Sequence, residues 1–147
     1  MISDNDISTD LVAYLQQREP FKILIGSAIF PDEVPADQDL PYCVYEHNGT
    51  ERDYHLSGSS GMAKASMRIE VFSKTRRFGR RVTEAIRLAF DGYTEGAMLA
   101  YDVRYVVITN TSAEHIQPTS GDSEGLFNST VDFEVTFRET VPTFPAS

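Results

Sequence analysis

Cysteine is almost absent from this sequence, and so are the segments that mark secreted or membrane proteins. Cys43 is the only cysteine among 147 residues, so no disulfide can form within the chain. We therefore expect a protein of a reducing compartment, with Cys43 as a buried structural thiol. The chain has no basic-then-apolar leader and no apolar run near the ~18 residues of a membrane span. We therefore expect a protein that is neither secreted nor inserted in a membrane.

Basic residues are also scarce. The chain has 13 lysines and arginines against 22 acids, a net charge of −9 and a pI of about 4.7, which argues against a free-standing nucleic-acid binder. The charge is divided unevenly, because residues 64–87 hold eight of the 13 basic residues and only two of the 22 acidic ones. Such a division suits head-to-tail self-association, in which a basic patch meets an acidic patch on the next copy.

No motif for catalysis, cofactors or metals stands out. The three histidines, His47, His55 and His115, lack metal-ligand spacing, although His47 and His55 could approach each other across a hairpin. Ser59 or Ser60 could be combined with His115 as a nucleophile and base, but no Gly-x-Ser-x-Gly elbow supports that reading. We therefore predict no catalytic residues, no cofactor and no metal, and expect that the protein is not an enzyme.

The clearest pattern is a strand followed by an amphipathic helix in the middle of the chain. Residues 65–72 alternate between apolar and polar side chains, which predicts a strand with one buried face. From Thr75 to Asp91 the spacing is helical, with Ser73 or Thr75 as the N-cap and Gly92 suited to a left-handed position after the last turn. The apolar arc of this helix contains Phe78, Val82, Ala85, Ile86, Ala89 and Phe90.

The opposite arc of the helix is rich in arginine. Arg76 and Arg77 lie at the N-terminus, where the helix dipole disfavours cations, and they form like-charge i,i+4 pairs with Arg80 and Arg81. One interpretation is a solvated face, since such penalties are small. The other is a subunit interface or a lumen surface, in which an acidic neighbouring subunit or nucleic acid meets these four arginines.

The other segments also show patterns of helix, strand and loop. Two of them carry specific expectations: the run Tyr105–Ile108 predicts a strand buried on both faces, and alternation over residues 127–138 predicts a long antiparallel strand. Before the central strand we expect a helix over 9–18 ended by Pro20, a helical turn or buried crossing at 21–25, a strand at 28–30 and an acidic proline-rich loop at 31–41. A strand at 42–47 follows; residues 53–56 either extend it or form its returning partner, and a flexible hairpin connection follows at 57–61. After the central helix we expect a strand at 103–111 and a mobile loop at 113–126.

These elements follow the order α-β-β-β-α-β-β. That order predicts an α+β fold with a single mixed, mostly antiparallel sheet and two helices packed on one face. The length of 147 residues fits a single domain over residues 1–147, with flexible tails at 1–7 and 140–147.

The order of elements resembles the tail-completion, or tail-terminator, family of long-tailed bacteriophages and prophages. The similar pieces are the N-terminal helix with Asp10–Leu15, Ile29–Pro31 after a short apolar run, the leucine-proline entry Leu40–Tyr45 into a long strand, the strand Met67–Phe72 with its helix, and the closing strand Phe127–Phe137. The resemblance covers about residues 8–139.

The resemblance implies a structural protein of the virion tail, assembled in the bacterial cytoplasm. It would form a homo-oligomeric ring, usually a hexamer, that caps the tail tube and meets the tail-tube protein and the head connector. DNA would pass through the ring transiently and without sequence specificity. Alternatives are another neck or tail adaptor, a generic bacterial α+β binding domain, or a small hydrolase.

Overall fold

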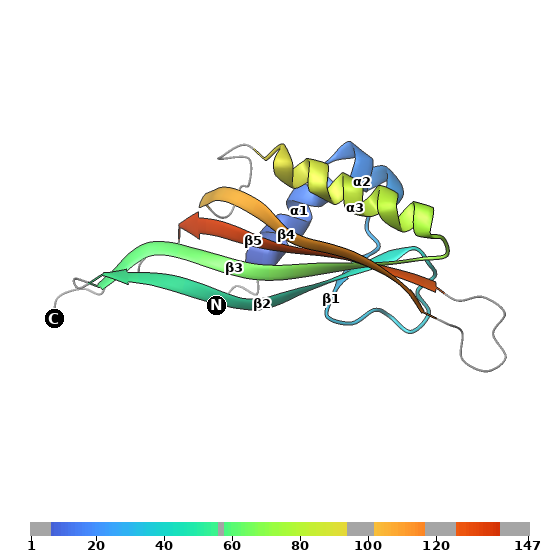
Figure 1. Cartoon of the computed structure of the whole chain (residues 1–147), viewed down its shortest axis with the longest axis horizontal. Helices are drawn as coiled ribbons and strands as arrows, with labels where there is room; N and C mark the ends of the chain where they lie inside the picture. Colours follow the sequence, from blue (N-terminus) through green and yellow to red (C-terminus); the bar gives the residue numbers. More distant parts are fainter. Residues whose placement is uncertain (1–6, 56–57, 94–101, 117–125, 139–147) are drawn as a thin grey trace.

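A five-stranded sheet with helices on one face forms the body of the protein (Figure 1). The computed structural model describes residues 7–55, 58–93, 102–116 and 126–138. The sheet has the order β1-β2-β3-β5-β4; β1 is parallel to β2, and the other pairings are antiparallel. The predicted α+β class with a mixed, mostly antiparallel sheet is confirmed. The described elements are α1 (Ile7–Gln16), α2 (Glu19–Leu24), β1 (Ile29–Pro31), β2 (Tyr42–His55), β3 (Gly58–Ser73), α3 (Arg76–Asp91), β4 (Asp102–Ile116) and β5 (Leu126–Arg138).

Apolar side chains from the helices and from one face of the sheet share a single core. Alternation along β3 and β5 sends every second residue toward the helices, which removes their apolar surface from water. Tyr14 of α1 ties two helices together, because its buried hydroxyl donates to the carbonyl of Ala89 at 2.8 Å. The largest fully buried side chains are Phe21, Phe90, Phe133, Leu11, Leu15, Met67, Ile69 and Ile86.

Helix α3 matches its prediction closely at its N-terminus. Thr75 is the N-cap, and its hydroxyl accepts a hydrogen bond from the Phe78 N–H at 3.1 Å. The expected left-handed Gly92 is wrong, since its φ is −88°. The Gly92 N–H instead bonds to the Leu88 carbonyl at 3.0 Å and closes the last helical turn without a positive φ.

Gly79 lies on the sheet-facing side of α3, where the helix comes very close to β5. A Cβ at this position would lie 2.7 Å from the Ser129 Oγ and 3.2 Å from the Ser73 Oγ, and both serines are buried. The missing side chain therefore permits the close approach of helix and sheet.

A third helix corrects the prediction of two helices. Pro20 lies in the first turn of α2, where a residue needs no backbone N–H, so it starts a helix and is not simply the end of the preceding one. The order in the described residues is therefore α-α-β-β-β-α-β-β. The short apolar run 21–25 is largely this helix, and its Phe21 is fully buried.

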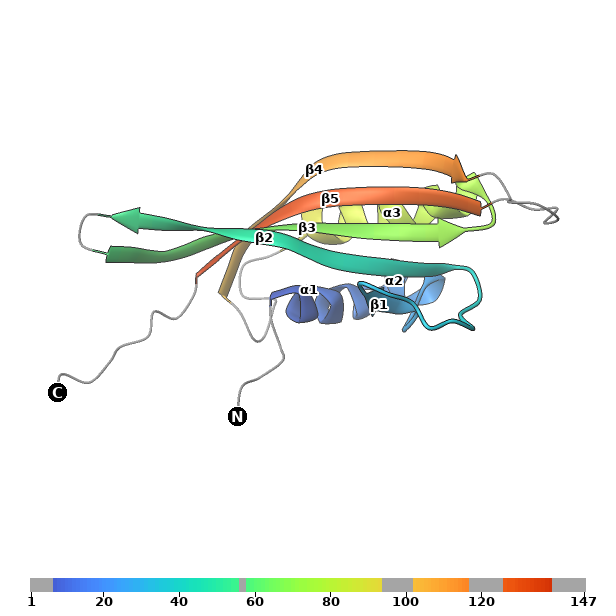
Figure 2. The same cartoon turned by 90° about the horizontal axis from the view of Figure 1, so that it is seen from below.

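The strands extend further than their sequence patterns indicated. Gly58–Gly61 belongs to β3, so the expected flexible connection at 57–61 is wrong except for Ser57, which lies outside the described residues. Beyond the helices, β2 and β3 continue as a hairpin arm (Figure 2). Likewise β4 runs to Ile116, into the loop expected from Ala113. Residues 117–125 and most of the predicted tails lie outside the described residues, although Ile7 is buried in α1.

The expectation that β4 is buried on both faces is also wrong. Val103 and Val106 are buried, but Tyr105 is 54% exposed and Val107 is 48% exposed. The cause is the position of β4 at the end of the strand order, with its outward face uncovered by any described helix.

Candidate functional site

The exposed arginines of α3 are the first part of the candidate site. The capped helix places Val82, Ile86 and Phe90 in the core, and the opposite face therefore projects into solvent. Arg76, Arg77, Arg80 and Arg81 are all exposed on the N-terminal half of that face. The structure thus brings together the four arginines that the sequence singled out.

Arg87, further along α3, has two acidic partners on its own helix. Arg87 pairs with Glu84 and with Asp91, whose carboxylate lies 2.7 Å from the guanidinium, and the hydrogen bond from Arg87 lowers the pKa of Glu84. Among the described residues, no acid forms an ion pair with Arg76, Arg77, Arg80 or Arg81. The Arg76 guanidinium lies over the Phe127 ring, 5.4 Å from its centroid. The N-terminal half of α3 therefore carries positive charge that no described carboxylate neutralises.

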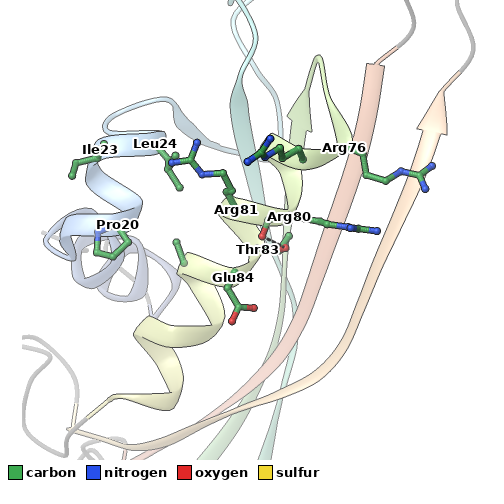
Figure 3. Close-up of a pocket in the computed structure, with 10 residues that line it drawn as sticks. Pro20, Ile23, Leu24, Arg76, Arg80, Arg81, Thr83 and Glu84 are labelled. Atoms are coloured by element: carbon green, nitrogen blue, oxygen red, sulfur yellow. Dashed lines mark hydrogen bonds between the residues drawn. The ribbon is translucent and has the colours of Figure 1, made fainter.

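A groove between α2 and this half of α3 is the second part of the site. It has a volume of about 920 Å³ and combines an apolar wall from α2 with the arginines of α3. Figure 3 shows Arg81 pointing toward α2, whereas Arg76 and Arg80 point toward the β5 and β4 side. Ile23, on the α2 wall, is 75% exposed and adds apolar surface to the groove. We name this the arginine groove; Pro20, Ile23, Leu24, Arg77, Arg81 and Ala85 are among its lining residues.

Sequence reasoning found the arginines but missed the apolar wall. The wall exists because α2 folds back beside α3, about fifty residues later in the chain. The available signal was Pro20 directly after Glu19, a pair typical of a first helical turn.

An acidic loop between β1 and β2 lies elsewhere on the surface. Its acids, Asp32, Glu33, Asp37 and Asp39, are exposed, and none forms an ion pair among the described residues. The predicted loop at 31–41 is confirmed, apart from Pro31 at the end of β1. In Figure 1 this loop, drawn in cyan, hangs on the side of the sheet away from α3.

The sheet face away from the helices also carries acids, and two of these have basic partners on the same face. Arg68 donates to Asp132 at 2.7 Å, and this hydrogen bond, with the charge of Asp132, raises the pKa of Arg68. Lys64 lies 3.8 Å from Glu134. The carboxylates of Asp132 and Glu134 are therefore already neutralised by bases on the same face.

The residues considered for catalysis and metal binding are not brought together. His115 is paired with Phe127, which in turn is paired with Ser73, so the β4 histidine lies at the far end of β3 from Ser59. At about 3.3 Å per residue, the fourteen positions between Ser59 and Ser73 span roughly 46 Å. His47 and His55 both lie in β2, so the idea that they meet across a hairpin is wrong.

The remaining candidate residue, Cys43, is fully buried in the core. Burial raises the pKa of its thiol, because the thiolate would lose its hydration. The expected burial of this cysteine is confirmed. In the described residues, no group of three or more histidines, cysteines or acids could hold a metal ion.

Comparison with known proteins identifies the family of this chain. The family model described as "Tail completion protein gp17" matches residues 9–138. The chain is a member of that family. Its sequence matches no curated protein. The resemblance to the tail-completion family that the order of elements indicated is confirmed. The protein is a structural component of phage tail completion and is located in the virion tail.

A solved chain of low sequence identity shares the fold of this tail completion protein. A chain titled "Virion of native gene transfer agent (GTA) particle" has 10% sequence identity and a TM-score of 0.70, and the match covers 90% of this chain and 94% of that one. The gp17 protein of bacteriophage SPP1 has 14% identity and a TM-score of 0.44, with 93% and 91% covered. None of the described helices is long and apolar enough to cross a membrane.

Proposed function

We propose that this tail completion protein forms a ring, most simply a hexamer, that caps the tail tube and joins it to the head connector. The observation that carries this proposal is the separation of charge on the surface. Arginines without described acidic partners lie on one side of the sheet, and acids without described basic partners lie on the other. Two different, complementary patches on each copy favour head-to-tail contacts, which form a ring when the rotation between neighbouring copies closes.

The hairpin arm supports contacts with further components. Here β2 and β3 extend past the helices and carry backbone pairing as far as His55 and Gly58. A paired arm of this length offers surface beyond the body for the tail-tube protein or the head connector (Figure 2).

Protein is a better partner for the arginines than DNA. A channel for DNA must release it freely, and a ring of exposed arginines would hold phosphates through counterion release. The net charge of −9 also disfavours stable DNA binding, so only transient, non-specific passage is expected. We propose no catalytic step for this protein; its role is mechanical joining.

Electron microscopy with purified tail tubes of the same phage tests this function. Gold-labelled protein should bind only at tube ends, and analytical ultracentrifugation should show a closed oligomer at low salt that weakens at moderate salt. Labelled protein spread along the tube sides, or absent from the ends, would contradict a capping role.

A further inference from the structure

We infer that the acidic loop of one copy docks in the arginine groove of the next copy, an inference that rests on the proposed ring. The loop is the segment 32–40, and the groove is the one between α2 and α3. The occupant is thus a second copy of this chain, and the contact is heterologous, because each copy contributes a loop to one neighbour and a groove to the other.

The charges of the two surfaces are opposite in sign. The loop carries four exposed acids and no base, and arginines of α3 line the groove, with Arg81 pointing toward α2. Guanidinium groups recognise carboxylates through paired N–H donors, so this combination gives both attraction and register. The sheet face is a poorer match, since Lys64 and Arg68 already partner Glu134 and Asp132 there.

The apolar components match as well. The groove presents Ile23 and Leu24 beside the arginines, and the loop intersperses Val34 and Leu40 among its acids. A volume of about 920 Å³ lies within the roughly 300–1,000 Å³ of pockets that enclose small ligands, so it is large enough for the tip of a loop.

The loop is built to bind without much further ordering. Prolines at 31, 35 and 41 restrict its backbone. The Asp32 N–H donates to the Tyr45 carbonyl at 3.0 Å, and the Gln38 N–H donates to the Pro35 carbonyl at 3.0 Å. A preorganised segment loses little conformational entropy on docking. The same rigidity keeps it on the far side of the sheet from its own groove, so docking requires a second copy.

Peptide binding tests the docking independently of ring formation. A fluorescein-labelled peptide of residues 29–45, which contains both partners of the Asp32–Tyr45 hydrogen bond and is blocked at both ends, should bind the full-length protein saturably at low salt by fluorescence anisotropy. Arg77→Glu/Arg81→Glu should weaken binding by about tenfold or more. The matched control Lys22→Glu/Lys74→Glu makes the same change in net charge at exposed positions that do not line the groove, and should retain most of the affinity. A peptide with the four acids replaced by their amides should not bind.

Charge exchange tests the docking within the assembly. Arg77→Glu/Arg81→Glu and Asp37→Arg/Asp39→Arg should each block association alone, and an equimolar mixture should restore it as an alternating ring. The exposed pair Glu51→Lys/Glu114→Lys is the control for the loop variant. Circular dichroism should show all variants folded.

The peptide-binding and charge-exchange experiments distinguish a failure of the docking from a failure of the ring. Absence of peptide binding, binding that survives Arg77→Glu/Arg81→Glu, or normal assembly of Asp37→Arg/Asp39→Arg overturns the docking, and in the last case the ring stands. Peptide binding by a wild-type protein that remains monomeric supports the docking and contradicts autonomous ring formation.

Discussion

Replacing Gly79 with alanine should destabilise this protein, although the same change stabilises most helices. Gly79 is inside α3, where alanine is favoured over glycine by about 1 kcal/mol. Its position against the sheet opposes that gain. The added Cβ would lie 2.7 Å from the Ser129 Oγ, closer than real Cβ atoms approach other atoms, and 3.2 Å from the Ser73 Oγ.

The neighbours have little freedom to move away. Ser73 donates a hydrogen bond to the Thr75 carbonyl at 2.7 Å, beside the residue that caps α3. Ser129 is buried on β5, which lies between β3 and β4 in the sheet. Overpacking of this kind costs about 1–3 kcal/mol, so the net loss after the gain in helix propensity is about 0–2 kcal/mol. For a domain of this size, 1 kcal/mol lowers the melting temperature by about 2–4 °C.

A double-mutant cycle measured by urea denaturation isolates the free-energy cost of the contact between the added Cβ at position 79 and the Ser129 Oγ. Ser129→Ala removes the Oγ and leaves the serine Cβ position at 3.6 Å, an ordinary contact. In that background Gly79→Ala should be neutral or stabilising, with a coupling energy of about 1–3 kcal/mol between the two sites. If Gly79→Ala stabilises the wild-type protein by the full ~1 kcal/mol, or if the cycle shows no coupling, the close approach does not govern this site.

Three further predictions concern the arginines, an ion pair and the cysteine. In the monomer, Arg76→Glu/Arg77→Glu should raise the free energy of unfolding by about 1 kcal/mol, because it removes a dipole conflict and two like-charge pairs. The melting temperature at a salt concentration that keeps the protein monomeric checks this, and a lower value there would refute it. The Glu84 carboxyl should titrate below its usual pKa of 4.5 by NMR, so its stabilising contribution is present above pH 4.5 and is lost as the pH falls through the lowered value. Arg87→Ala should return that pKa toward 4.5, and an unchanged titration would exclude the pairing. Buried Cys43 should resist thiol reagents at pH 8 in the native protein and react on unfolding, whereas rapid native labelling would show that it is accessible.

The parts of the fold that could be predicted depend on local pattern. Helix α3 has a strong apolar arc and a capping threonine within a few residues, and strand β5 alternates over most of its length. Such signals need only neighbours in the chain, so their positions were predicted to within a residue or two. By contrast, the arms of β2 and β3 contain Gly49 and Gly58, which local propensity assigns to turns. Pairing across the hairpin stabilises these residues as strand.

The candidate site divides in the same way. The four arginines follow from helical periodicity, since residues three and four apart share a face. The groove does not, because its apolar wall comes from α2, whose place beside α3 is a tertiary contact. The sequence also showed that the loop is acidic and proline-rich, but not that it lies on the opposite side of the sheet.

The sequence by itself determined the α+β class, the periodic helix α3 with its arginine face, the burial of Cys43 and the family resemblance. Tertiary structure alone decided that Tyr105 and Val107 are exposed, because burial of a strand depends on its place in the sheet and β4 is at an edge. It also decided that Gly79 permits helix and sheet to touch, since that need arises from Ser129, fifty residues away. Local pattern reflects the backbone geometry of a few adjacent residues, whereas exposure and close packing depend on which distant segments become neighbours when the chain folds.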